Sequence, residues 1–122
     1  EQPNSICLIV EKAGRITGYL LAYKAADEAE IARIAVVKEL QRQGAARALL
    51  AELEAICGSD GINRILLDVR SGNAAARSLY ESAGFKEDGI RQRFYENPVE
   101  DAVLMSRDLP AVPTVNRAEI SI

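Results

Sequence analysis

The residues from Gln41 to Arg47 combine side-chain types that suit an anionic ligand. They follow an apolar run, residues 31–37, and they open a segment whose apolar spacing predicts an amphipathic helix to about Cys57. The first N–H groups of a helix lack intrahelical partners, and the helix dipole favours negative charge there. Gly44 and the alanines after it leave the backbone open to a ligand, and an arginine on each side can pair with phosphate. This segment therefore predicts a site for a phosphorylated ligand.

Composition and length exclude several classes of function. The chain has 122 residues, enough for one domain, and its net charge of −3 comes from basic and acidic residues mixed along the sequence. Such mixing argues against nucleic-acid binding through bulk electrostatics. No apolar run approaches the roughly 20 residues that a membrane span needs. The absence of histidine removes Ser–His and Cys–His nucleophile pairs and the commonest metal ligand, so we expect no metal site.

The two cysteines indicate the compartment. Cys7 lies in an apolar strand pattern and Cys57 on the apolar face of the helix, which predicts two buried, reduced thiols. Reduced thiols and an N-terminus unlike a signal peptide favour a cytoplasmic protein. A disulfide or a reactive thiol is the alternative.

The apolar patterning predicts the element order β-β-β-α-β-α-β-β, an α/β (α+β) fold with a mixed sheet. The predicted strands are 6–11, 16–23, 30–37, 62–69, 85–92 and 101–107. The first three should form an antiparallel meander, and strands joined through helices should run parallel. The strand at 62–69 is apolar enough to predict burial on both faces. Residues 1–109 form the predicted domain, and 110–122 a C-terminal tail with weak strand character.

Several short motifs occur in a definite order along the chain. They are Ile34-Ala35-Val36, then Gln41-x-x-Gly44-x-Ala46, then Asp68-Val69-Arg70, and then Asn73-x-x-Ala76-x-x-Leu79-Tyr80-Glu81-x-x-Gly84-Phe85. This set resembles the GCN5-related N-acetyltransferases, the GNAT superfamily. The later residues Arg91-x-x-Phe94-Tyr95, followed by Glu100-Asp101-Ala102 and Met105, resemble its bacterial ribosomal-protein-alanine N-acetyltransferases. The resemblance spans about residues 6–108.

The resemblance implies acetyl-CoA as the cosubstrate. Its pyrophosphate would lie on the backbone N–H groups of the segment after Gln41, and its pantetheine arm would pair with a strand edge where strands 31–37 and 62–69 separate. The implied cofactor-binding residues are Ile34, Ala35, Val36, Arg42, Gln43, Gly44, Ala45, Ala46, Arg47 and Asn73. An ordinary strand-to-helix turn is the plainer interpretation. A P-loop NTPase fits poorly, because no Lys-Ser/Thr follows Gly44.

Two residues match the family's acid and base. Tyr80 would donate a proton to the leaving thiolate, since a phenol with a pKa near 10 stays protonated at neutral pH. Asp68 stands where the alanine acetyltransferases carry a glutamate base, and its carboxylate would fall roughly 1.5 Å short without a bridging water. The alternatives are a core tyrosine bonded to backbone, and an aspartate that caps the turn at Ser71 or Gly72. Asn73 could equally cap a helix.

The acceptor half departs further from the pattern. Phe94 stands where the family commonly has a tyrosine, whereas Tyr95 keeps the second one, and both are candidate acceptor-binding residues. Glu100 and Asp101 either attract a cationic peptide N-terminus or form a charged loop. The family's first strand and the helices after it, one wall of the acceptor groove, have no match here. Residues 114–122 could replace that strand in a neighbouring subunit, giving a strand-exchanged homodimer. The plainer alternative is a monomeric, truncated chain with a disordered tail.

The sequence thus predicts acetyl transfer from acetyl-CoA to a protein or peptide N-terminal α-amine, for example that of a ribosomal protein. An α-amine with a pKa near 8 needs less help from a base than a lysine near 10.4. Acetylation of lysine or of a small amine is the first alternative. A catalytically weak CoA-binding module is the second.

Overall fold

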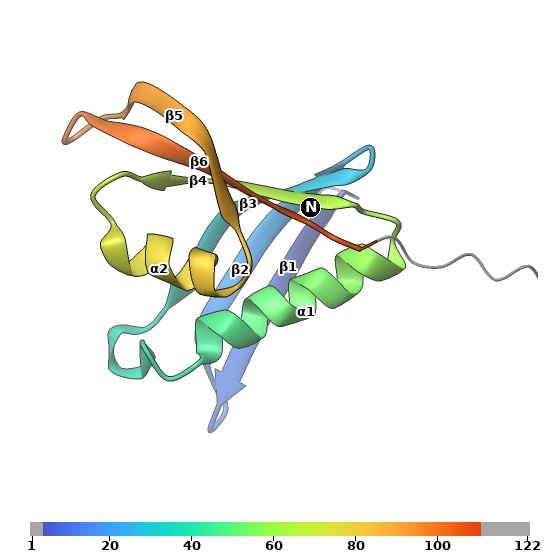
Figure 1. Ribbon diagram of the computed structural model, residues 1–122. Coiled ribbons are helices and arrows are strands. Elements are labelled where there is room, and N and C mark those ends of the chain that lie inside the picture. Colours follow the sequence, from blue (N-terminus) through green and yellow to red (C-terminus); the bar gives the residue numbers. More distant parts are fainter. Residues whose placement is uncertain (1–3, 111–122) are drawn as a thin grey trace, which may run out of the picture.

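Figure 1 shows the computed structural model, which describes residues 4–110. Within this range six strands form one mixed sheet in the spatial order β1-β2-β3-β4-β6-β5. The strands are β1 (Ser5–Lys12), β2 (Arg15–Ala25), β3 (Glu28–Val36), β4 (Arg64–Arg70), β5 (Lys86–Tyr95) and β6 (Glu100–Asp108). The helices are α1 (Ala45–Ser59), α2 (Ala74–Ser82) and the short 3-10 helix η1 (Lys38–Leu40). The predicted order and mixed fold class are confirmed, and η1 is an addition.

The sheet combines an antiparallel meander with a parallel junction. β1, β2 and β3 pair antiparallel in sequence, and β4 lies parallel to β3. β6 inserts between β4 and β5 and runs antiparallel to both. The turn between β1 and β2 has positive φ at Ala13 and Gly14, which matches the twist that tight hairpins need. The predicted meander and the predicted parallel pairing through α1 are therefore confirmed.

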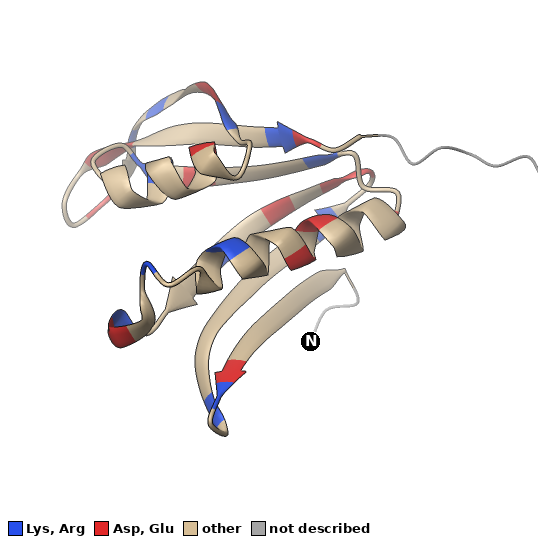
Figure 2. Ribbon diagram, turned by 60° about the horizontal axis from the view of Figure 1, so that its bottom comes forward, with Lys and Arg blue, Asp and Glu red and all other residues tan. Residues whose placement is uncertain are grey.

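Both helices lie on the same face of the sheet, as the two views in Figures 1 and 2 agree. The predicted apolar stripe of α1 is confirmed, because its residues Leu49, Leu50, Leu53 and Cys57 are buried. On β4 the side chains alternate: Ile65, Leu67 and Val69 are buried, whereas Leu66 and Asp68 are half-buried. The prediction that this strand is buried on both faces is wrong, because in the described range the helices cover only one face.

The other face of the sheet carries exposed apolar groups among the described residues. Ile9 is 51% exposed and Tyr23 37% exposed. Cys7 is two residues before Ile9 on β1 and so shares its face of the sheet. Cys7 is exposed, so the prediction that both cysteines are buried is wrong for Cys7. The reason is the two-residue period of a strand, which points Ile6 to the core and Cys7 away from it. Cys57 is buried, and both cysteines are free thiols.

The second helix has clear boundaries. The Asn73 side chain accepts a hydrogen bond from the Ala76 N–H at 3.1 Å and so caps α2. Gly84 follows the C-cap with a φ of +96°, which confirms its predicted place after the helix. Tyr80 is the buried residue of α2, and its ring meets Phe85 edge-on, with 5.7 Å between centroids.

The parallel junction opens along its length. β3 and β4 pair only through Glu28–Glu30 and Arg64–Leu66, and beyond Leu66 the two strands separate. This confirms the predicted separation of these strands, and it places a gap between Ile34 and Asp68. Part of the predicted tail, residues 111–122, lies outside the described residues. In the described part of the chain no helix is long and apolar enough to span a membrane.

Candidate active site

A cavity of about 790 Å³ occupies the gap between β3 and β4 and extends to the start of α1. The residues that line it include most of those that the sequence predicts for the site: Ile34, Ala35, Val36, Arg42, Gly44, Ala46, Arg47, Asp68, Asn73, Tyr80 and Tyr95. Gln43, Ala45 and Phe94 were also predicted for the site and do not line this cavity. The structure therefore brings the candidate acid, the candidate base and most candidate cofactor contacts to one hollow.

The start of α1 presents backbone donors at one end of this cavity. Gly44 is the N-cap, with a φ of +87°, and no side chain caps the helix. The first helical hydrogen bond runs from the Ala48 N–H to the Gly44 carbonyl, at 2.9 Å, so the three N–H groups before it have no helical partner. A Cβ on Gly44 would meet no atom within 4 Å, so the left-handed backbone rather than space favours glycine here.

Two glutamines brace the loop before α1. The Gln41 amide donates to the Val36 carbonyl at 3.0 Å, and the Gln43 amide donates to the Glu39 carbonyl at 3.2 Å. Gln43 therefore points back to the 3-10 helix, and this explains why it does not line the cavity. The Gln41 contact ties this loop to the end of β3, where the candidate pantetheine edge lies, and the Gln43 contact ties it to η1.

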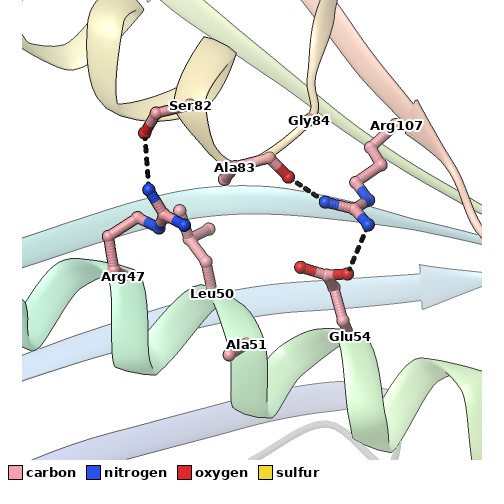
Figure 3. Close-up of a pocket in the computed structure, with 8 residues that line it drawn as sticks. All are labelled: Arg47, Leu50, Ala51, Glu54, Ser82, Ala83, Gly84 and Arg107. Atoms are coloured by element: carbon pink, nitrogen blue, oxygen red, sulfur yellow. Dashed lines mark hydrogen bonds and ion pairs between the residues drawn. The ribbon is translucent and has the colours of Figure 1, made fainter.

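The two arginines of the loop differ in their surroundings. Arg42 is exposed, has a φ of +64°, and forms no ion pair with any described residue. Arg47 instead donates to the Ser82 hydroxyl oxygen at 2.9 Å, across to α2 (Figure 3). Both arginines line the large cavity, and the Arg47 side chain also bridges the two helices.

Arg47 also lines a second, smaller cavity of about 240 Å³ between the helices. There Arg107 of β6 pairs with Glu54 of α1 at 3.0 Å and donates to the Ala83 carbonyl at the end of α2 (Figure 3). The Arg107 guanidinium lies where a side chain on Gly84 would go. These contacts hold α2, and with it Tyr80, against α1.

Tyr80 is buried, yet its hydroxyl is available. Within the described residues the hydroxyl has no hydrogen-bond partner, and it is not among the side-chain atoms that are sealed from solvent. The alternative of a core tyrosine bonded to backbone is therefore wrong. Burial, with a smaller contribution from Tyr95, raises the pKa of Tyr80 to about 12, so the phenol stays protonated at neutral pH.

Asp68 is half-buried on the opposite wall and lines the same cavity. It does not cap the following turn, because Glu100 accepts the hydrogen bonds of the Gly72 N–H and the Ser71 hydroxyl instead. The capping alternative is therefore wrong, and in the described part of the chain the carboxylate has no hydrogen-bond partner. Tyr95 lines the same cavity, and burial and the Asp68 charge raise the pKa of its phenol.

Three residues of the acceptor hairpin contact other groups of the protein. Phe94 is 42% exposed and packs against Tyr95 and the Arg91 guanidinium rather than the cavity. Glu100 is engaged with Arg70 and with the turn before α2, as a charged residue of a structured loop. Asp101 accepts from the Arg93 N–H at 2.9 Å. Of these contacts, those of Glu100 join residues far apart in the sequence, which local patterns could not show.

Some cavity residues carried no prediction. Arg33 and Arg70 add positive charge to the lining, and Leu40 and Leu79 add apolar surface. Arg70 was visible only as part of the Asp68-Val69-Arg70 motif, and Leu79 as part of the helix stripe. The place of Arg33 in the lining follows from the alternation of side chains along β3, together with a bulge opposite Leu21 and Ala22 that shifts the register of the strand. The described residues contain no group of three His, Cys, Asp or Glu side chains that could hold a metal ion.

The mixed sheet, with strands that separate beside the start of a helix, is the fold of the GNAT acetyltransferase class. A profile of the Acetyltransferase (GNAT) family matches residues 1–85, and the chain belongs to this family. Enzymes of the family use acetyl-CoA as cosubstrate. The separation of β3 and β4 next to the start of α1 suits that ligand.

Within this family, the chain is similar to acetyltransferases with a stated acceptor or ligand. The ribosomal protein bS18-alanine N-acetyltransferase of Escherichia coli strain K12 is 40% identical over 95 residues, 76% of this chain and 64% of that protein. The crystal structure of the ribosomal-protein-S18-alanine N-acetyltransferase from Escherichia coli matches with a TM-score of 0.85 and 33% identity, over 95% of this chain and 76% of that one. An acetyltransferase from Bacillus anthracis in complex with acetyl coenzyme A has a TM-score of 0.82 and 26% identity, over 89% and 65%. The chain thus spans somewhat less than two thirds of the curated Escherichia coli relative.

Proposed function

We propose that this protein transfers the acetyl group of acetyl-CoA directly to the N-terminal α-amine of a protein, with Tyr80 as general acid and Asp68 as general base. The observation that carries the proposal is the shared cavity, which Tyr80 and Asp68 line together with the free donors at the start of α1. The similarity to alanine N-acetyltransferases of ribosomal protein S18 supports an α-amine acceptor.

The cofactor half of the site fits a pyrophosphate and an extended arm. The N–H groups of the first turn of α1 supply donors, and the exposed Arg42 supplies a cation beside them. The separated edge of β3 at Ile34–Val36 leaves backbone groups for the pantetheine amides. Asn73 holds the start of α2 through its side-chain oxygen and leaves its amide N–H₂ for the cosubstrate.

The chemistry removes two protons from the acceptor nitrogen and gives one proton to the sulfur. Asp68 accepts the first from the acceptor ammonium, directly or through a water, which frees the amine lone pair to attack the thioester carbon. As the carbon–sulfur bond breaks, Tyr80 donates its phenolic proton to the leaving sulfur, and the second proton from the nitrogen returns Tyr80 to its protonated form as the amide forms. The raised pKa of Tyr80 keeps the phenolic proton in place before the reaction. With no histidine in the chain, this pair supplies the acid–base chemistry.

The chemistry also favours an α-amine over a lysine. An α-amine has a pKa near 8, so roughly a tenth to a quarter of it is neutral near pH 7 to 7.5, while a lysine near 10.4 is almost wholly charged. A short aspartate base suits the easier acceptor. We place the reaction in the cytoplasm, on N-termini such as that of a ribosomal protein, with the chain acting as a monomer. Sizing chromatography at micromolar concentration separates this state from a strand-exchanged homodimer built through residues 114–122.

The deciding experiment presents a peptide library with acetyl-CoA and reads products by mass spectrometry. Peptides with a free N-terminal alanine are paired with the same peptides carrying a blocked N-terminus and an added lysine. We expect acetylation of the free α-amine at least tenfold faster than that of the lysine. Equal or faster acetylation of the lysine would reject the α-amine proposal.

The second candidate is a CoA-binding module with little catalysis, and the shorter Asp68 favours it. Calorimetry that shows acetyl-CoA binding, together with no thiol release over a panel of amines, would support this candidate. Absence of acetyl-CoA binding would reject both functions. The cavity residues predict binding in either case.

A further inference from the structure

We propose that Arg70 and Glu100 form a clamp that positions Tyr95 on the acceptor wall of the cavity and so sets acceptor binding. Neither residue is proposed to touch the reacting atoms. The inference rests on the proposed function, because it assigns the acceptor side of the same cavity. It also carries a structural consequence, the place of the Tyr95 ring, that can be measured without turnover.

Arg70 makes contacts through both terminal nitrogens of its guanidinium and through its stacking on Tyr95. It donates to the Pro98 carbonyl at 3.1 Å and to the Glu96 carbonyl at 3.1 Å, and so holds the turn between β5 and β6. It pairs with Glu100 at 3.3 Å. Its guanidinium carbon also lies 4.5 Å from the centroid of the Tyr95 ring, which is the geometry of a cation–π contact. One side chain thus connects β4, which carries Asp68, to the hairpin that carries Tyr95.

Glu100 extends the connection to the other wall. One of its carboxylate oxygens accepts from Arg70, and the other accepts from the Gly72 N–H and from the Ser71 hydroxyl at 3.4 Å. A Cβ on Gly72 would lie 2.7 Å from this second oxygen, so a side chain there would displace the carboxylate from the Gly72 N–H. Because Asn73 follows at once and caps α2, Glu100 joins the acceptor hairpin to the helix of Tyr80.

The clamp is more than a surface ion pair. The side chains of Arg70 and Glu100 are 35% and 23% exposed, and both charges are satisfied by several directed hydrogen bonds. The Gly72 N–H and Arg70 lower the pKa of Glu100, so it stays ionised at neutral pH.

Tyr95 is the side chain that this arrangement places. It lines the cavity, and its charge state is coupled to both Asp68 and Tyr80, the candidate base and acid. A small shift of its ring would reshape the space beside the attacking amine, and a misplacement of about 1 Å can cost on the order of a hundredfold in rate. The cofactor contacts at α1 lie at the other end of the cavity and do not depend on the clamp.

The test compares the clamp with an ion pair outside the cavity. E100Q and R70K weaken the clamp, because the amide of glutamine offers a donor where Arg70 already donates, and lysine lacks the planar fork. D60N is the matched control, since Asp60 pairs with Lys24 at 3.1 Å, away from the acceptor wall and from the helix that carries Tyr80. We expect E100Q to raise the acceptor KM on the order of tenfold, with acetyl-CoA Kd changed less than twofold, and R70K to lie between E100Q and wild type.

A second readout needs no substrate. NMR of the Tyr95 ring, assigned with Y95F, should show shifted resonances in E100Q and wild-type resonances in D60N. If the wild-type chain turns over and E100Q and D60N change the acceptor KM equally, the positioning role is wrong. If the wild-type chain is inactive, the ring resonances still decide, since an unmoved Tyr95 in E100Q overturns the inference whatever the activity.

Discussion

Tyr80 and Asp68 line one cavity from different elements, and the functional oxygen atoms of both side chains have no hydrogen-bond partner among the described residues. The Tyr80 hydroxyl has no partner among the described residues, and the turn that Asp68 could have capped is served by Glu100. Buried polar groups normally find partners inside the protein, so two unpartnered groups lining one cavity favour a ligand that completes them. This is the strongest argument at the scale of single residues.

Replacing Tyr80 by phenylalanine tests the acid. We expect Tyr80→Phe to lower kcat on the order of a hundredfold, because general acid catalysis contributes about that much. The acetyl-CoA Kd should stay the same, because the ring keeps its edge contact with Phe85. Thiol release and calorimetry measure the two quantities. A kcat within twofold of wild type would remove Tyr80 from the chemistry.

The pH profile follows from the same residue. kcat/KM should rise with pH toward about 8, as the acceptor α-amine loses its proton. The active form of Tyr80 is protonated, and its pKa is about 12, so that form persists throughout the range in which an ordinary tyrosine would ionise. We therefore expect a plateau from about pH 8 to 10 rather than a bell. Initial rates measured with a short peptide acceptor check this, and a decline centred near pH 10 would contradict it.

At the scale of elements, two helix starts and one strand junction build the site. α1 begins without a side-chain cap and leaves donors for a ligand, whereas α2 begins with the Asn73 cap and has its donors partly satisfied. The junction of β3 and β4 closes at Leu66 and opens beyond it. Periodicity in the sequence predicts each element, and the difference between the helix starts determines which one can receive an anion.

Asn73 has two proposed roles that substitutions can separate. Asn73→Asp keeps an oxygen for the Ala76 N–H, so stability should change little, while the lost amide donor should weaken acetyl-CoA binding. Asn73→Ala loses the cap as well and should lower the free energy of unfolding by about 1 kcal/mol. Urea unfolding and calorimetry supply the two numbers. Unchanged acetyl-CoA affinity in both variants would leave Asn73 with the capping role alone.

At the scale of the whole molecule, one core lies between the sheet and its two helices, and the cavity interrupts the sheet beside that core. Figure 2 shows both signs of charge spread over strands and helices, so no single field dominates the described residues. The face away from the helices exposes Ile9 and Tyr23. The stability of the fold therefore depends on the packing of two helices against one face of the sheet, and a ligand in the cavity can add to that packing.

Acetyl-CoA should accordingly stabilise the fold. A ligand that binds only the folded state at a hundred times its Kd adds about 2.7 kcal/mol, which raises the Tm of a domain this size by on the order of 10 °C. Thermal unfolding with and without acetyl-CoA measures the shift, and CoA that lacks the acetyl group serves as a matched ligand. No shift at saturating acetyl-CoA would contradict binding in this cavity.

Local patterning predicted most of the architecture. The stripe on α1, the glycine after α2 and the meander of β1 to β3 depend on neighbours a few residues apart, and all three were confirmed. The burial of Cys7 and of both faces of β4 was predicted wrongly. Those properties depend on which face of the sheet the helices cover, and no local pattern contains that information.

By itself, the sequence determined the order of elements, the loop with its glycine at the start of α1, and the family to which the motifs point. Only the tertiary structure decided that Arg47 reaches Ser82, that Glu100 serves Gly72 and Arg70, and that the Tyr80 hydroxyl remains free. The physical reason is distance along the chain: caps, turns and stripes join residues within about one helical turn. The partners of the clamp are 28 to 30 residues apart and meet only when the sheet assembles.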